Sequence, residues 1–455
     1  MFEMASEVPP EPATCAPVGL LDARTVEAWA QALRGIGRDL SDAARIDQIR
    51  ALEVLKCTAE AAQAVLAADF DGSQRARRAE RGVPAERQGR GVAEQVALAR
   101  RESPHRGRQH LGLAKVLRDE LPCTMAAFRA GRITEWRATL IARETACLSL
   151  ADRLAVDQRI GGDPAQLEAM GDGELCSRVK EIAYELDAEA WVKRRARAEA
   201  DRRVTCRPAP DVMTHVSALL PVKQGVAVYA ALRAEADRLT ATGDPRGRGQ
   251  IMADLLYQRV VSPTNEGTAH VGVTIEVVVS DRVLLGLEDG AAHVHGYGPI
   301  PGDLARELAI DPELAVAMRR LYAPPGSGRL VAMDAKATSF PPALARFINL
   351  RDRICRTPWC DAPVRHRDHV ESLDEGGLTS AGNGQGLCEQ CNHAKQAAGW
   401  RARPRPGPRH TVETTTPTGH SYASTAPPSR APTGVPGGSC GLRVDFAIVE
   451  LALAC

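Results

Sequence analysis

Four cysteines in two close pairs are the residues of this sequence best suited to bind a metal. They follow a C-x4-C and a C-x2-C spacing, with a polar stretch between the pairs, and are Cys355, Cys360, Cys388 and Cys391. Four thiolates in two such pairs are typical of a closed tetrahedral zinc site. Four unrelated core cysteines are the alternative, which the tight pairing disfavours. A disulfide framework is disfavoured by the other eight, irregularly spaced cysteines. We expect structural Zn²⁺, which would supply folding energy to a polar segment.

Harder metal ligands lie between and just after these pairs. The carboxylate of Asp368 and the amide oxygen of Asn392 suit Mg²⁺ or Mn²⁺. Beside such an ion, His369 could deprotonate a water for attack on phosphorus, while the metal stabilises the leaving oxygen. His393 directly follows Asn392, and spacing alone chooses between them as the ligand. The pattern indicates a metal-dependent hydrolase in which zinc organises the site and a second ion does the chemistry.

Local elements must bring these side chains together. Residues 364–370 (VRHRDHV) predict a short strand, followed by a glycine-containing loop and a helix over 386–397. Residues at steps i, i+3, i+4 and i+7 of a helix share one face, and here they are Cys388, Cys391, Asn392 and Lys395. Zinc would therefore fix the helix that presents Asn392 to the Asp-His pair.

The segment 355–395 resembles the HNH endonuclease module, a ββα-metal fold, in its zinc-braced form. The resemblance implies that Asp368 is a metal ligand, that His369 is the general base and that Asn383 orients the loop carrying that base. It implies that Asn392, with Lys395 three residues later, supplies the other ligand. Ser372 departs from the pattern, since many members have proline there. The implied activity is hydrolysis of DNA phosphodiester bonds. A zinc-braced DNA-binding or scaffold protein that does not cut, and an RNA-directed nuclease, stay open as alternatives.

The preceding sequence resembles a helical domain of unknown function that often precedes HNH modules in bacteria of high genomic GC. The residues that carry this resemblance are LPCTMAAFRAGRIT at 121–134, GYGPIP at 296–301, and Arg351-Asp352. Trp400 and PTGHSY at 417–422 match the usual tail. The resemblance implies a mainly helical body over most of residues 20–350 and no known activity.

Composition supports the same fold class. Apolar residues make up 44% of the 455 residues and aromatics only 4%, so the core must be mostly Ala, Leu and Val, which favours helices over a β-sandwich. We expect a mainly α N-terminal body with a few strands (α+β), followed by a small ββα-metal HNH domain with a four-cysteine zinc site. The expected divisions are a disordered 1–16, a helical 17–345 with a sub-boundary near 161–205, a nuclease domain at 346–402, and a Pro/Arg/Ser/Thr-rich tail at 403–455.

Several elements are predicted within these divisions. Helices are expected from Ser41-Asp42 onward, over 164–203, 224–239 and 341–353, with a charged loop at 73–91. Strands are expected at 204–209, 212–221 and 270–279, and strand-plus-turn segments at 293–301 and 328–335. A hairpin is expected around 417–419, and the apolar 442–455 should pack on the body or on a partner.

The charge balance bears on partners. The formal net charge is only +1, so any DNA footprint must be local. Its candidates, with an ordinary solvated surface as the alternative, are Arg353, Arg356, Arg365, Arg367, Lys395 and Arg401. We expect double-stranded DNA as the partner, with oligomerisation possible through the helical body. The start is no signal peptide and no apolar run reaches membrane-spanning length, so we expect a cytoplasmic protein without a membrane contact.

Overall fold

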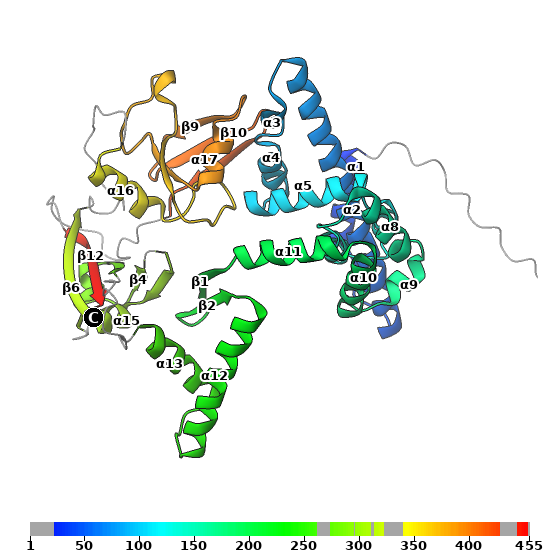
Figure 1. Cartoon of the computed structure of the whole chain (residues 1–455). Coiled ribbons are helices and arrows are strands. Elements are labelled where there is room, and N and C mark those ends of the chain that lie inside the picture. The colour runs from blue at the N-terminus through cyan, green and yellow to red at the C-terminus, as the bar shows by residue number, and fades with distance from the viewer. Residues whose placement is uncertain are drawn as a thin grey trace, which may run out of the picture.

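A computed structural model describes residues 22–261, 274–294, 296–310, 314–322, 340–427 and 444–453 (Figure 1). The disordered segment expected at 1–16 and the strand expected at 328–335 lie outside these ranges. The described chain is mainly helical with several small sheets, as the composition predicts. Within it, no helix combines the length and apolar character needed to cross a membrane.

The first half of the chain is a bundle of helices. Ser41 caps the longest of them, accepting a hydrogen bond from the backbone N–H of Ala44. The core of the bundle is mostly aliphatic, with Phe128 as its one fully buried aromatic ring. The helices are α1 Ala23–Arg34, α2 Asp42–Glu80, α3 Ala85–Gln88, α4 Val92–Arg100, α5 Pro104–Asp119, α6 Pro122–Arg129, α7 Glu135–Glu144, α8 Leu150–Gly161, α9 Pro164–Ala169, α10 Asp172–Leu186 and α11 Ala188–Ala200.

Two predictions for this half are wrong. Residues 73–80 are not a loop but the last turns of α2, where Arg75 pairs with Asp71 one turn earlier and Gln74 is buried. The single helix expected over 164–203 is three helices. The chain breaks at Met170-Gly171, which are extended, and again at Asp187, whose carboxylate caps α11.

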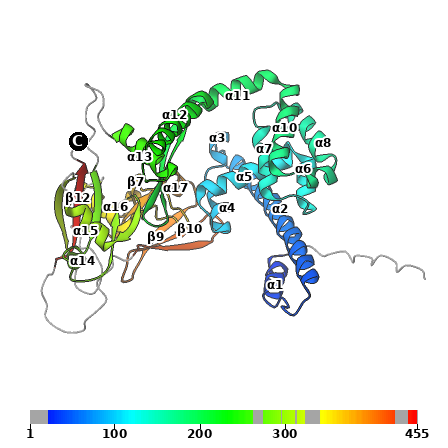
Figure 2. The same ribbon diagram turned by 90° about the horizontal axis from the view of Figure 1, so that it is seen from below.

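The apolar repeat that identifies α2 does not mark its buried face. Ile46 and Ile49 are 58% and 62% exposed. The buried positions begin at Cys57 and continue with the small residues Ala61, Ala64 and Ala68. The N-terminal half of α2 projects from the bundle beside α1 (Figure 2), which explains the exposure of its large side chains.

An extended region and a second sheet follow the bundle. Strands β1 Arg203–Ala209 and β2 Met213–Leu219 lie where two strands are predicted and pair as an antiparallel hairpin, and α12 Val222–Ala241 matches the expected helix. Helices α13 Arg248–Val261, α14 Asp281–Leu284 and α15 Gly302–Ile310 complete the region. The sheet order is β5-β4-β3-β12-β6, with β3 Thr274–Val279, β4 Ala291–Val294, β5 Gly298–Pro301, β6 Leu314–Tyr322 and β12 Val444–Leu453. The apolar C-terminus therefore pairs with the body of its own chain, antiparallel to β3 and β6.

The cysteine segment forms a separate small module. It runs through α16 Pro342–Asp352, β7 His366–His369, the 3-10 helix η1 Leu373–Glu375, β8 Gly384–Leu387 and α17 Glu389–Lys395. A three-stranded sheet of β9 Arg401–Arg405, β10 Thr411–Thr415 and β11 Ser421–Thr425 follows, and its β10–β11 turn is the predicted hairpin. Val412 of this sheet and Val370 after β7 share one buried cluster. The module and its sheet lie beside α3 and α4 of the bundle in both views (Figures 1 and 2).

The start of the predicted helix at 386 is wrong. Gly386 and Leu387 belong to β8, which pairs antiparallel with β7, and the helix begins after Cys388. A Cβ on Gly386 would lie 2.7 Å from the Val364 side chain, so only glycine allows this close strand approach.

Candidate metal centre and adjoining polar site

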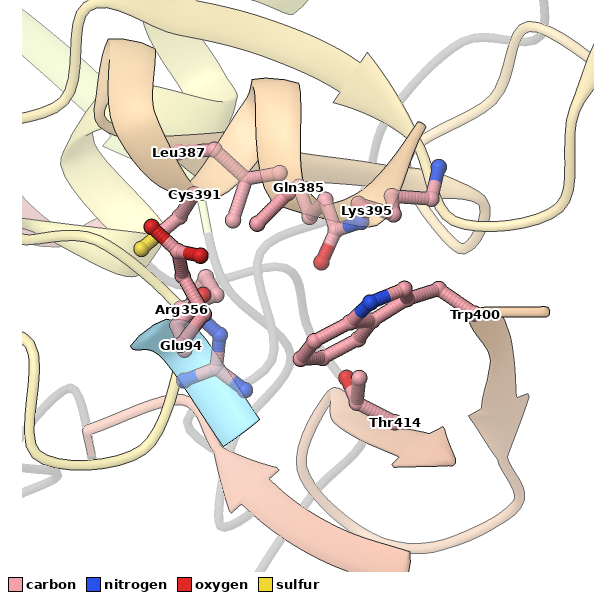
Figure 3. Close-up of a pocket in the computed structure, with 10 residues that line it drawn as sticks. Glu94, Arg356, Gln385, Leu387, Cys391, Lys395, Trp400 and Thr414 are labelled. Atoms are coloured by element: carbon pink, nitrogen blue, oxygen red, sulfur yellow. The ribbon is translucent and has the colours of Figure 1, made fainter. Parts of the chain in front are cut away.

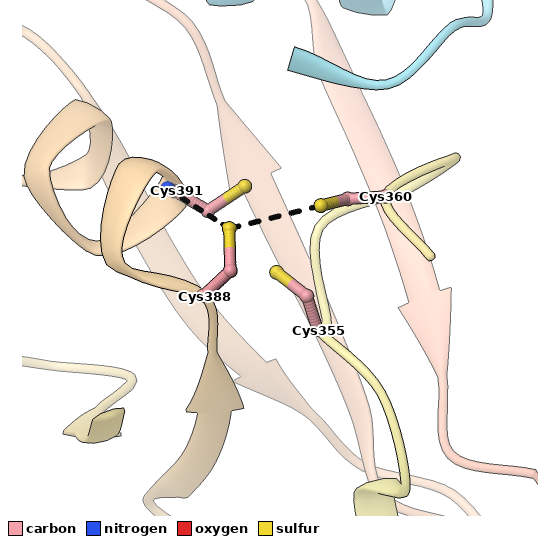
Figure 4. Close-up of side chains that lie close together, drawn as sticks. All are labelled: Cys355, Cys360, Cys388 and Cys391. Atoms are coloured by element: carbon pink, nitrogen blue, oxygen red, sulfur yellow. Dashed lines mark hydrogen bonds between the residues drawn. The ribbon is translucent and has the colours of Figure 1, made fainter. Parts of the chain in front are cut away.

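The four cysteines converge on one buried point. Their sulfur atoms all lie within 4.8 Å of one another, and Figure 4 shows them pointing inward from two segments. The Sγ atoms of Cys360 and Cys388 are 3.8 Å apart. Zinc–sulfur bonds of about 2.3 Å in a tetrahedron place the sulfurs about 3.8 Å apart. The donor set, its spacing and its burial therefore fit a zinc ion, and the group can hold one.

Local backbone structure forms each half of this centre. The N–H of Cys360 donates to the carbonyl of Thr357 (3.1 Å), which closes a tight turn after Cys355. Cys388 is the N-cap of α17, and its sulfur accepts the N–H of Cys391 at 3.4 Å. Hydrogen bonds from the other three thiols, that of Cys355 first, lower the pKa of Cys388. A lowered pKa favours the thiolate, which is the form that binds metal.

Asp368 is in β7 and lies where the β7–β8 strand pair contacts α17. Its Oδ2 accepts from Lys395 Nζ at 2.6 Å and from Gln385 Nε2 at 3.3 Å. Gln385 is directly opposite Asp368 in the β7–β8 register. Lys395 also donates to the backbone carbonyl of His369. Among the described residues, no hydrogen bond to Asp368 Oδ1 is present, so this oxygen is available as a ligand atom.

His369 is oriented by two neighbours. Its Nε2 is 2.9 Å from Thr379 Oγ1, and its ring centroid lies 4.5 Å from that of Phe340. Partial burial lowers the pKa of His369, opposed by the charge of Asp368. Both effects together leave a neutral imidazole near pH 7, as a general base requires.

Asn383 ties the loop after His369 into one unit. Its Oδ1 accepts from the N–H of Glu371 (2.9 Å), while Nδ2 donates to the carbonyls of Glu371 (3.0 Å) and Leu378 (2.9 Å). The side chain is buried. These bonds fix the loop that leads from the histidine to Thr379.

Asn392 has the property of a ligand that His393 lacks. Its Oδ1 is buried and has no hydrogen-bond partner in the described structure, whereas His393 is exposed. An unpaired buried oxygen is unfavourable unless something binds it. A divalent cation bound by oxygen ligands fits this atom, and the geometry favours Asn392 over His393.

The candidate DNA-contacting residues divide into two groups. Arg356 is only 4% exposed and donates to the carbonyls of His410 and Ser424, so its expected role as a surface contact is wrong. Burial of its guanidinium lowers the pKa of Arg353, which is half-buried. Lys395 is engaged with Asp368. The side chains that remain exposed are Arg365, Arg367 and Arg401.

Sequence reasoning did not find several residues that hold the site. Thr379 and Gln385 contact the Asp-His pair through a loop and a strand register that spacing does not reveal. Arg351 donates to the carbonyls of Ala381 and Gly384 as well as to Asp352. The resemblance drew attention to Arg351-Asp352, but their role in joining α16 to β8 is visible only in the structure.

These features define a protein with a helical body and a small four-cysteine ββα module. The model of the family described as "Domain of unknown function (DUF222)" matches residues 39–352, and the chain belongs to this family. The match ends three residues before Cys355, so the metal centre lies beyond it. No curated protein and no solved structure matches the chain.

Proposed function

We propose that the protein is an HNH-type endonuclease that hydrolyses DNA phosphodiester bonds with a divalent cation. The observation that carries the proposal is the buried Oδ1 of Asn392, which has no hydrogen-bond partner in the described structure. A centre that only held zinc would not need this unpaired oxygen on the helix that Lys395 joins to the Asp-His strand. A second ion-binding site next to His369 accounts for it.

The oxygen donors fit Mg²⁺ or Mn²⁺, with Asp368 Oδ1 and Asn392 Oδ1 as the protein ligands. The bound ion would stabilise negative charge on the scissile phosphate and on the leaving oxygen. His369 accepts the proton of the attacking water, and Thr379 and Phe340 hold its ring. Lys395 keeps the Asp368 carboxylate oriented, because it fixes one oxygen and leaves the other free. Exposed Arg365, Arg367 and Arg401 would contact phosphates. A cytoplasmic setting fits this chemistry, since the zinc-ligating thiols must stay reduced.

Plasmid nicking with Mg²⁺ or Mn²⁺ tests the proposal on the full chain. We expect the wild type to convert supercoiled DNA to nicked or linear forms, and His369→Ala to lose this activity while retaining zinc. Equal cutting by both proteins would refute the assigned base. Cutting of RNA but not DNA would favour an RNA-directed nuclease.

A module that binds DNA without cutting is the second candidate. One observation favours it, because Asp368 already has a cationic partner in Lys395. Gel-shift binding by a wild type that cuts no form of DNA or RNA would support this reading.

A further inference from the structure

The helical body forms hydrogen bonds with α17, the helix that carries Asn392 and Lys395. Arg90, in the loop before α4, donates from Nε to the backbone carbonyl of His393 (3.1 Å) and from Nη2 to Gln396 Oε1 (3.4 Å). In the first turn of α4, the 5% exposed Glu94 accepts from Gln390 Nε2 at 2.7 Å. Two residues about 300 positions upstream thus hold both ends of α17.

The contact is close enough to be specific. Gly91, the N-cap of α4, has a φ of +77°, and a Cβ there would lie 2.7 Å from Trp400 Nε1. Gln95 Oε1 accepts from Thr418 Oγ1 at 3.2 Å. Figure 3 shows Glu94 facing the small space bounded by Cys391, Trp400 and Arg356. That space is about 20 Å³, which is on the order of one water molecule.

Helix α17 needs a brace of this kind. It has 7 residues, and isolated helices this short are unstable in water. The cysteines fix its N-terminal end. Its last carbonyls have no partner within the helix, and a guanidinium that binds one of them also suits the negative end of the helix dipole. Arg90 binds the carbonyl of the residue next to Asn392, in the half that zinc does not hold.

We propose that Arg90 and Glu94 are positioning residues for the metal-binding site. Through them, the helical domain that the family model matches helps to fix the positions of Asn392 and Lys395. The zinc centre and Glu94 hold the first turn of α17, and Arg90 holds the second. Both residues lie inside the matched range 39–352, so this assigns a task to the domain whose function is unknown. The effect on cutting rests on the proposed nuclease function, whereas the effect on α17 does not.

Hydrogen–deuterium exchange of the full chain tests the brace directly. Arg90→Ala and Glu94→Ala should each speed exchange of the amides in 389–397. The expected increase is about tenfold for Arg90→Ala, because a bond to a charged donor is lost. Arg90→Lys, which keeps a donor and the charge, should restore part of the protection. Arg87→Ala is the matched control, since Arg87 is exposed three residues earlier and makes no side-chain hydrogen bond in the described structure. Unchanged exchange in Arg90→Ala, or an equal effect of Arg87→Ala, would overturn the proposal.

Two further measurements on the same proteins separate positioning from general damage. Zinc per chain should stay at the wild-type level in Arg90→Ala, and loss of zinc would overturn the division of labour along α17. If the wild type cuts DNA, Arg90→Ala should lower kcat about tenfold at an unchanged KM for DNA, as expected when a charged hydrogen bond that positions the site is lost, and raise the Mn²⁺ concentration for half-maximal rate. A higher KM for DNA at an unchanged kcat would contradict a positioning role for Arg90. Faster exchange in Arg90→Ala beside an inactive wild type would leave the brace standing and refute only the nuclease function.

Discussion

Replacing Asn383 by alanine should release the loop between β7 and β8 without disturbing the zinc centre. The side chain makes three hydrogen bonds, all to backbone groups of Glu371 and Leu378. At about 1 kcal/mol for each buried bond, their loss should lower the free energy of local opening by about 3 kcal/mol. This corresponds to roughly a 150-fold increase in the open population.

The Glu371 amide reports this opening directly, because its N–H is the donor to Asn383 Oδ1. We expect its exchange in Asn383→Ala to be faster by about two orders of magnitude, with zinc content unchanged and plasmid nicking strongly reduced. The zinc should persist because the cysteines form their own buried cluster.

A second variant reaches the same loop from the other side. A Cβ on Gly377 would lie 2.1 Å from the carbonyl oxygen of Glu371 and 2.6 Å from Asn383 Nδ2, so Gly377→Ala should reproduce the effect. Gly382→Ala is its control, since the nearest atom to a Cβ there is 3.9 Å away. If the Glu371 amide exchanges as slowly in Asn383→Ala and Gly377→Ala as in the wild type, Asn383 does not hold the loop between β7 and β8.

Four other perturbations have defined outcomes. Cys388→Ser and Cys391→Ser should each lower zinc per chain, measured by elemental analysis, and wild-type zinc content in both would contradict the four-cysteine site. Burial, followed by the charge of Arg351, lowers the pKa of His410 from 6.5 to about 4. The folded state therefore binds fewer protons than the unfolded state between these pH values. The free energy of unfolding should fall by up to about 3 kcal/mol as the pH drops from 6.5 toward 4. His410→Gln should flatten this part of the thermal-melting profile, and identical profiles would refute it. Arg356→Ala should lower the melting temperature, because two backbone carbonyls lose their hydrogen-bond donor. The double variant Arg365→Ala, Arg367→Ala should bind DNA more weakly and with a smaller salt dependence, at an unchanged melting temperature.

Short-range patterns made much of this structure predictable from the sequence. The four-cysteine cluster follows from the cysteine spacing, and α2 follows from its capping residue Ser41 and its apolar periodicity. The β1 and β2 strands and the β10–β11 hairpin follow from short strand-like runs and turn residues. These features depend on neighbours within a few residues, which a single sequence contains.

The errors arise where distant contacts decide the outcome. Arg356 reads as a surface residue, yet it is buried because β11 and the chain before β10 place two carbonyls around its guanidinium. Gly386 reads as the start of a helix, yet pairing with β7 makes it part of a strand. Arg90 and Glu94 lie in a stretch read as loop and helix with no chemistry, because their partners are about 300 residues away.

The contacts of Lys395 explain why a seven-residue helix can serve a site that needs fixed geometry. Lys395 is in the last turn of α17, and its amino group reaches both Asp368 and the carbonyl of His369. The pair is mostly buried, with side-chain exposures of 16% and 19%, so removing either partner would leave an uncompensated charge. That cost ties the position of α17 to the position of the Asp-His pair. Any displacement of the helix end by loss of Arg90 is therefore transmitted to Asp368, and the brace from the helical body acts on both sides of the site at once.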